Sequence, residues 1–158
     1  FKDIGSASGI AFDRMGGSTG AMGIDCGFFR NDENLAVAIG NFANEPSSLY
    51  ITHAGKPQFS DKASATGFGP QTKRMLTFGL FFADMDLDGL QDIVCANGHL
   101  EEEIGKVQPN QRYMQPPQLF WNAGRNDLAS DELVPLTQEQ TGADFQQPMV
   151  GRGAAYAD

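Results

Sequence analysis

The sequence predicts an all-β fold built from repeated four-stranded antiparallel sheets. Its 158 residues include 19 glycines and 8 prolines, a density of turn-forming residues that is typical of many short strands rather than long helices. Hydrophobic residues make up 41% of the chain, which is enough for a packed core. The length fits one domain of ordinary size.

Internal similarity is the second observation behind this fold class. A large apolar residue is followed eight positions later by glycine at three places, in residues 1–9, 59–67 and 134–142. The spacing of these segments indicates a repeat. We therefore expect one domain over residues 1–158, divided into a first repeat at about 10–67, a second at about 68–142 and an incomplete third at 143–158.

Each repeat holds about four strand-like runs. The second repeat has runs at 76–83, 92–96, 118–122 and 133–137. Asp-Gly, Asn-Gly and Ala-Gly pairs between such runs favour antiparallel connections. Four antiparallel strands that recur in this way are the pattern of a β-propeller blade. We expect about two full blades with an extra strand at each end.

Two blades do not close a ring, because propellers typically have roughly four to eight. Either the chain belongs to a longer propeller, or copies of it associate through their open blade edges, which otherwise promote aggregation. The second repeat also carries an insertion at 100–117, which we expect to be a surface loop with Glu101, Glu102 and Glu103 in solvent.

One loop of the second repeat carries the residues of a calcium site. Asp84, Asp86, Asp88 and Asp92 occupy its positions 1, 3, 5 and 9. Calcium prefers about six to eight oxygen ligands, and carboxylates on alternate residues converge where the chain coils around the ion. Glycine at position 6 permits the sharp turn. The side chains of these aspartates and the backbone carbonyl of Leu90 are the predicted Ca²⁺ ligands.

The flanking residues distinguish this loop from a helical calcium sensor. Position 12 is Cys95, where an EF-hand has a bidentate glutamate, and strand-like runs lie on both sides. Magnesium fits less well because it keeps several waters. A solvated acidic turn without metal is the alternative.

The equivalent loop of the first repeat has lost this pattern. Phe28, Arg30 and Ala36 stand opposite Asp84, Asp86 and Asp92, and only Asp32 keeps a carboxylate. We expect no calcium here. Arg30 is expected to pair with Asp32 or Asp25.

Several segments together resemble a known family. Residues 78–93 (FGLFFADMDLDGLQDI) resemble an FG-GAP (VCBS-type) repeat. The wider pattern is similar to the propeller of the ASPIC/UnbV (cartilage acidic protein-like) group over essentially the whole chain. Its matching stretches are GIAFD at 9–13, AMGID at 21–25, NF at 41–42 with EP at 45–46, ANGH at 96–99, QLF at 118–120 and GRGAA at 151–155.

This resemblance implies a propeller of seven or a similar number of blades, usually secreted, with calcium in its hairpin loops. Such propellers serve recognition and adhesion. The resemblance gives Asp84, Asp86, Asp88, Leu90 and Asp92 as the metal ligands. We therefore expect a calcium-binding module with a structural, adhesion or protein-interaction role, located outside the cell, in the periplasm or at the cell surface, with a protein or glycan partner.

A carbohydrate-active enzyme, either a polysaccharide hydrolase or lyase, or its sugar-binding accessory domain is the alternative function. His99 is a candidate base with Asp25 or Glu45 as its partner, and His53 is the other histidine. Aromatic residues such as Phe28, Phe29, Phe81, Phe82 and Trp121 are candidates to line a sugar site. The sequence has no nucleophile elbow, phosphate loop or Cys/His zinc spacing, so no catalytic constellation is recognised.

Charge and composition limit the partners further. A formal charge of -9 disfavours nucleic acid, whose phosphates such a surface repels. No apolar run approaches the ~18 residues needed to span a membrane. The cysteines Cys26 and Cys95 are too few for a disulfide framework, and buried free thiols are the expected state.

Overall fold

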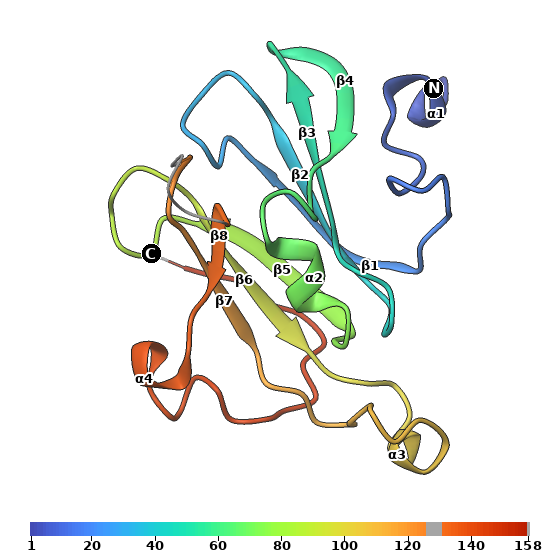
Figure 1. The fold of residues 1–158 in the computed structure, drawn as a ribbon, viewed down its shortest axis with the longest axis vertical. Coiled ribbons are helices and arrows are strands. Elements are labelled where there is room, and N and C mark those ends of the chain that lie inside the picture. Colours follow the sequence, from blue (N-terminus) through green and yellow to red (C-terminus); the bar gives the residue numbers. More distant parts are fainter. Residues whose placement is uncertain (126–130, 158) are drawn as a thin grey trace.

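The computed structural model describes residues 1–125 and 131–157, which form two four-stranded antiparallel sheets (Figure 1). The all-β prediction is therefore confirmed. The strands of the first sheet, in spatial order, are β1 (Ala21–Gly27), β2 (Ala36–Asn41), β3 (Ser48–His53) and β4 (Lys56–Asp61). Those of the second sheet are β5 (Thr77–Ala83), β6 (Asp92–Asn97), β7 (Gln118–Asn122) and β8 (Leu133–Pro135).

The four strands expected in the second repeat coincide with β5 to β8, with ends that differ by at most two residues. In the first sheet, the Ala-Gly turn between β3 and β4 has positive φ at both central residues, 50° at Ala54 and 66° at Gly55. Positive φ at both positions is the feature of a type I′ turn, whose twist matches that of the flanking strands.

The two sheets have the same pairing register. Ala21 pairs with Asn41 in the first sheet as Thr77 pairs with Asn97 in the second, and a β-bulge follows each of these pairs. The next strand pairs correspond as well: the Val37–Tyr50 pair of the first sheet matches the Ile93–Phe120 pair of the second. Residues at these paired positions of one sheet therefore have defined counterparts in the other.

The hydrophobic core lies between the two sheets. Strand β5 packs on the face formed by β1 and β2. Alternate residues of each strand point into this interface. The core cluster contains Ala36, Ala38, Leu49 and Ile51 from the first sheet, Leu80, Phe82, Ile93, Cys95, Phe120 and Leu133 from the second, and Phe29, Ala63 and Phe68 from the connections.

The described residues also form short helices: α1 (Gly5–Ser8) precedes β1, α2 (Phe68–Thr72) and α3 (Ile104–Val107) lie in connections between strands, and α4 (Gln138–Thr141) follows β8. Helix α2 contributes to the core through Phe68, whose ring packs edge-on to Phe120 with centroids 5.0 Å apart. None of the helices in the described residues is long and apolar enough to cross a membrane.

The expected extra strand at each end of the chain is wrong. Within residues 1–125 and 131–157, strands begin at Ala21 and end at Pro135, and the later segment contributes a single isolated bridge between Gln115 and Met149. A strand is stabilised by hydrogen bonds to a neighbour at its edge, and the C-terminal segment lies on the face of β5 instead, with Ala154 against Gly79. The described residues form two sheets and not a closed ring.

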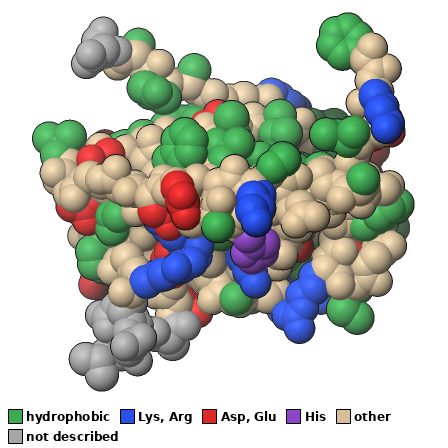
Figure 2. Space-filling view, turned by 90° about the horizontal axis from the view of Figure 1, so that it is seen from above, with side chains coloured by type: hydrophobic (Ala, Val, Ile, Leu, Met, Phe, Trp, Pro, Cys, Tyr) green, Lys and Arg blue, Asp and Glu red, His purple; other side chains and the backbone are tan. Residues whose placement is uncertain are grey.

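The insertion at 100–117 lies on the surface only in part. Glu101, Glu102 and Glu103 are exposed as expected, but Ile104 and Gln111 are buried. Hydrophobic side chains also reach the surface: Figure 2 shows them gathered along the upper edge of the view, between the protruding ends.

Candidate metal centre

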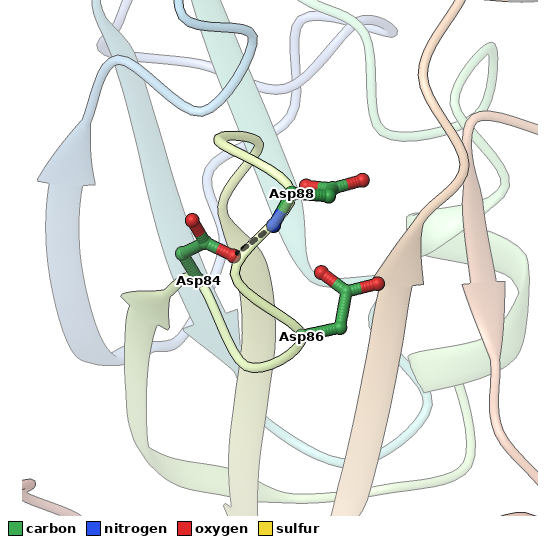
Figure 3. A group of neighbouring side chains, drawn as sticks. All are labelled: Asp84, Asp86 and Asp88. Carbon is green, nitrogen blue, oxygen red and sulfur yellow. Dashed lines mark hydrogen bonds between the residues drawn. The ribbon is translucent and has the colours of Figure 1, made fainter.

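Three aspartates converge in the loop between β5 and β6. One carboxylate oxygen from each of Asp84, Asp86 and Asp88 lies within 4.8 Å of the others. Asp84 is half-buried, and Asp86 and Asp88 are exposed. Figure 3 shows the three side chains around the coiled loop backbone. Oxygens at this separation are close enough to share one cation, since calcium ligands lie about 2.3–2.6 Å from the ion.

Hydrogen bonds from backbone N–H groups to aspartate side chains give the loop its coiled shape. The Asp84 carboxylate accepts from the N–H of Asp88 at 3.0 Å and from the N–H of Gly89 at 2.9 Å. The Asp88 carboxylate accepts from the N–H of Leu90 at 2.8 Å. Leu87 and Gly89 have positive φ, 62° and 89°, and glycine adopts this conformation without strain. The glycine at position 6 thus lies where the chain turns back.

Asp92 opens β6 beside this group. Its side chain is 2% exposed and accepts hydrogen bonds from the N–H groups of Asn122 at 2.8 Å and Met85 at 3.0 Å. Burial raises the pKa of Asp92, the two hydrogen bonds oppose this rise, and the charges of Asp86 and Asp88 add to it. Asp92 therefore fixes the base of the loop, and the three converging oxygens come from the other aspartates.

Leu90, the predicted carbonyl ligand, is half-buried, and its side chain lies beside Gly124. Its N–H is held by Asp88. Leu90 is thus tied to the loop through its backbone.

Trp121 is a neighbour of the loop that the sequence reasoning missed. Its indole Nε1–H donates to Asp86 Oδ2 at 2.8 Å. Trp121 lies on β7, which is paired with β6, so sheet pairing brings it to the loop. It is the only tryptophan of the chain, so its fluorescence reports on the surroundings of Asp86.

The three carboxylates have no cationic partner in the part of the chain that the structure describes. The ion pairs found there join Arg30 to Glu132 and Lys106 to Glu103. Neighbouring carboxylates repel one another. Water or a bound cation therefore has to compensate their charge.

The corresponding loop of the first sheet is held by an ion pair. Arg30 binds Glu132 through two N–H···O contacts of 2.5 Å, and its guanidinium lies 4.8 Å from the centroid of the Phe29 ring. The expected ion pair of Arg30 with Asp32 or Asp25 is wrong. Glu132 is far away in sequence and reaches Arg30 only because the two sheets pack together. Among the described residues, the only acidic group of metal-binding geometry is the one in the second sheet.

The candidate catalytic residues have structural partners. His99 is buried, its Nδ1 accepts from the N–H of Glu101 at 3.0 Å, and its ring packs edge-on to Phe42. Its candidate partners bind elsewhere, because Asp25 accepts from the N–H of Phe82 and Glu45 from that of Gly20.

His53 and the two cysteines lie in separate places and do not form a common site. His53 is exposed and hydrogen-bonded to Ser60 at 2.7 Å. Both cysteines are free, as expected. Cys95 is buried, and burial raises the pKa of its thiol. Cys26 is exposed, which corrects the expectation that both thiols are buried.

Comparison with known proteins adds no further constraint. No family model matches this sequence, and no curated protein matches it at a significant level. The chemistry of the metal centre is therefore argued from its own residues.

Proposed function

We propose that the loop from Asp84 to Asp92 binds one calcium ion, and that the ion stabilises the β5–β6 hairpin of a propeller-type binding module. The observation that carries this proposal is the convergence of three carboxylate oxygens within 4.8 Å in a loop whose spacing puts aspartates at positions 1, 3, 5 and 9. The loop backbone is already coiled by its own hydrogen bonds.

Calcium is favoured over magnesium by the composition of the loop. Its oxygen-only donors are all hard ligands, and several come from the protein itself. Magnesium retains most of its waters and uses one or two carboxylates. Outward-facing Asp86 and Asp88 leave room for the waters that complete a calcium coordination shell.

The role of the ion is structural. Asp84 follows β5 directly and the loop returns into β6 at Asp92, so a cation held by Asp84, Asp86 and Asp88 would stabilise the connection between two adjacent strands. The matching registers of the two sheets support the assignment of each as one blade of an FG-GAP-type propeller. Such a module serves adhesion or recognition outside the cell, with a protein or glycan as its partner.

Thermal unfolding with and without calcium tests the proposal. For a Kd of about 0.1 mM, which lies in the range of extracellular modules, ~10 mM calcium stabilises the fold by about 2.7 kcal/mol. For a chain of this length, that is roughly 5–10 °C in Tm. Asp86→Asn keeps an acceptor for Trp121 but removes a charge, so it should abolish most of this shift.

The matched control is Asp32→Asn, which removes a carboxylate from the equivalent loop of the first sheet. It should leave the calcium-dependent shift intact. A shift of the same size in both variants would show that calcium acts at other sites and would refute the proposal.

A further inference from the structure

A pocket of about 250 Å³ lies at one end of the second sheet. Its walls come from three segments: the residues just before β5, the insertion between β6 and β7, and the segment that follows β8. We name it the insertion pocket. The calcium loop joins the opposite ends of β5 and β6, as Figure 1 shows, so the pocket is separate from the metal centre.

Hydrogen bonds of Gln115 hold the three walls together. Its side chain is buried, and its Oε1 accepts from the N–H of Leu76 at 2.9 Å, which ties the insertion to the start of β5. Its backbone N–H donates to the carbonyl of Met149 at 2.9 Å, beside Pro148 in the third wall. The pocket is therefore formed by specific contacts between segments that are far apart in sequence.

The first sheet supports the pocket from one side. Asn44 accepts from Gln111 Nε2 at 3.1 Å, and its N–H donates to the carbonyl of Lys73 at 2.9 Å. The insertion and the segment before β5 are thus bound to the same residue. The first sheet has only residues 42–47 where the second has residues 98–117, so this pocket is particular to the second sheet.

The lining combines an apolar floor with two cationic side chains. The apolar part consists of Met75, Met114, Pro116 and Pro148. Arg74 and Arg112 are exposed at the pocket, and none of the described residues that line it is acidic. The chain as a whole has 20 acidic residues against 11 lysines and arginines. The pocket therefore departs from the charge of the molecule and is suited to an anionic group.

Both arginines have donors to offer to a ligand. Arg112 Nη1 donates to the carbonyls of Pro109 at 2.7 Å and Gln111 at 2.9 Å, which orients the guanidinium while Nε and Nη2 keep further N–H groups. Arg74 takes part in neither of the ion pairs found in the described residues. A guanidinium binds carboxylates through paired N–H···O contacts.

The size and lining of the pocket suit one side chain of a partner protein. Sites for whole small molecules typically measure about 300–1,000 Å³, which is more than the 250 Å³ found here. An aromatic ring is favoured as the occupant, because methionine sulfur makes favourable contacts with aromatic rings. Aromatic residues, methionine and arginine are also enriched in protein interfaces. A sulfated glycan would bind the arginines but has no large apolar group for the floor.

We infer that the insertion pocket binds an acidic segment of a partner protein, with one aromatic side chain in the pocket and carboxylates on Arg74 and Arg112. The charges match, and the apolar floor buries the ring. The inference gives the proposed binding module a class of partner, and it does not depend on calcium.

Methionine methyl NMR tests the inference site by site. Met75 and Met114 line the pocket, Met85 lies in the calcium loop, and Met15 lines a different pocket at the first sheet. The full chain, labelled with methyl-¹³C methionine and free of metal, is titrated with the acetylated and amidated pentapeptide EDFDE. The Met75 and Met114 signals should shift and saturate, while those of Met15 and Met85 stay in place. A separate titration with calcium alone should move Met85, so a failure of the calcium proposal is seen independently.

Matched peptides and variants define the specificity. KKFKK reverses the charge and EDGDE lacks the ring, and each should bind at least about tenfold more weakly, because a hydrogen bond to a charged group and a buried aromatic side chain each contribute about a decade of affinity or more. Arg74→Ala should weaken EDFDE binding by about tenfold for the same reason. Arg14→Ala, which removes an exposed arginine outside the insertion pocket, should bind EDFDE as the wild type does.

Three results would overturn the inference. The first is equal binding of EDFDE and KKFKK. The second is the absence of saturable shifts at Met75 and Met114 up to about 10 mM peptide, since a site weaker than this contributes under about 3 kcal/mol. The third is a heparin fragment that moves these two signals while EDFDE does not, which would assign the pocket to a sulfated glycan instead.

Discussion

Replacing Ala21 by threonine should stabilise the protein by completing a hydrogen bond that only the second sheet has. In that sheet, Thr77 Oγ1 donates to Asn97 Oδ1 at 2.7 Å. The matching pair in the first sheet is Ala21 and Asn41, so the hydroxyl is missing. As a result, Asn41 Oδ1 is buried without a hydrogen-bond partner.

The rest of the Asn41 environment already matches its counterpart. Asn41 Nδ2 donates to the carbonyl of Pro46 at 2.7 Å, as Asn97 Nδ2 donates to that of Pro116 at 2.9 Å. Threonine at position 21 therefore supplies a donor to an acceptor that is in place. One net hydrogen bond contributes about 1 kcal/mol, or roughly 2–4 °C in Tm for a chain of 158 residues.

Urea unfolding should be compared for Ala21→Thr and Ala21→Val. Valine has nearly the same shape and strand propensity but no hydroxyl, so the difference between the variants isolates the hydrogen bond. Thr77→Val should show the converse, a loss of about 1–3 kcal/mol from an unpaired Asn97. If Ala21→Thr is no more stable than Ala21→Val, the register argument for this site is wrong.

Two further predictions concern buried charges. Glu132→Gln should cost about 3 kcal/mol in urea unfolding, since it leaves the largely buried Arg30 without its counterion. Lys106→Ala breaks the exposed pair with Glu103 and should cost far less; equal losses would contradict the burial argument. Because the pKa of Asp92 is raised in the folded state, its contribution to stability is present below its unfolded pKa of 3.8 and is lost as pH rises through the raised value. The difference in unfolding free energy between calcium-free wild type and Asp92→Asn should therefore change as pH rises above 3.8, and a flat difference would refute the assignment.

The strands of the second sheet were predictable because apolar runs alternate with glycine turns there. The β-bulges after Ala21 and Thr77 could not be predicted, because no residue type in the sequence marks them. The correspondence of Asn41 with Asn97 likewise follows from the pairing of the strands. Short runs of alanine and glycine carry too little side-chain information to fix a register by eye.

Long-range partners could not be predicted at all. Arg30 was expected to pair with Asp32 or Asp25, and it binds Glu132, which immediately precedes β8 of the other sheet. Trp121 reaches Asp86 through the pairing of β7 with β6. The loop itself was predictable because its ligands lie close together in sequence, and their geometry is set by local turns.

The calcium claim is tested most directly by titrating calcium into the metal-free protein while following heat and the fluorescence of Trp121. The account predicts one ion per chain with a Kd of about 0.1–1 mM, a change in fluorescence on binding, and at least a tenfold weaker affinity for Asp86→Asn. Asp32→Asn should bind as the wild type does. Absence of both heat and fluorescence change up to about 10 mM calcium, or equal binding by Asp86→Asn, would contradict it.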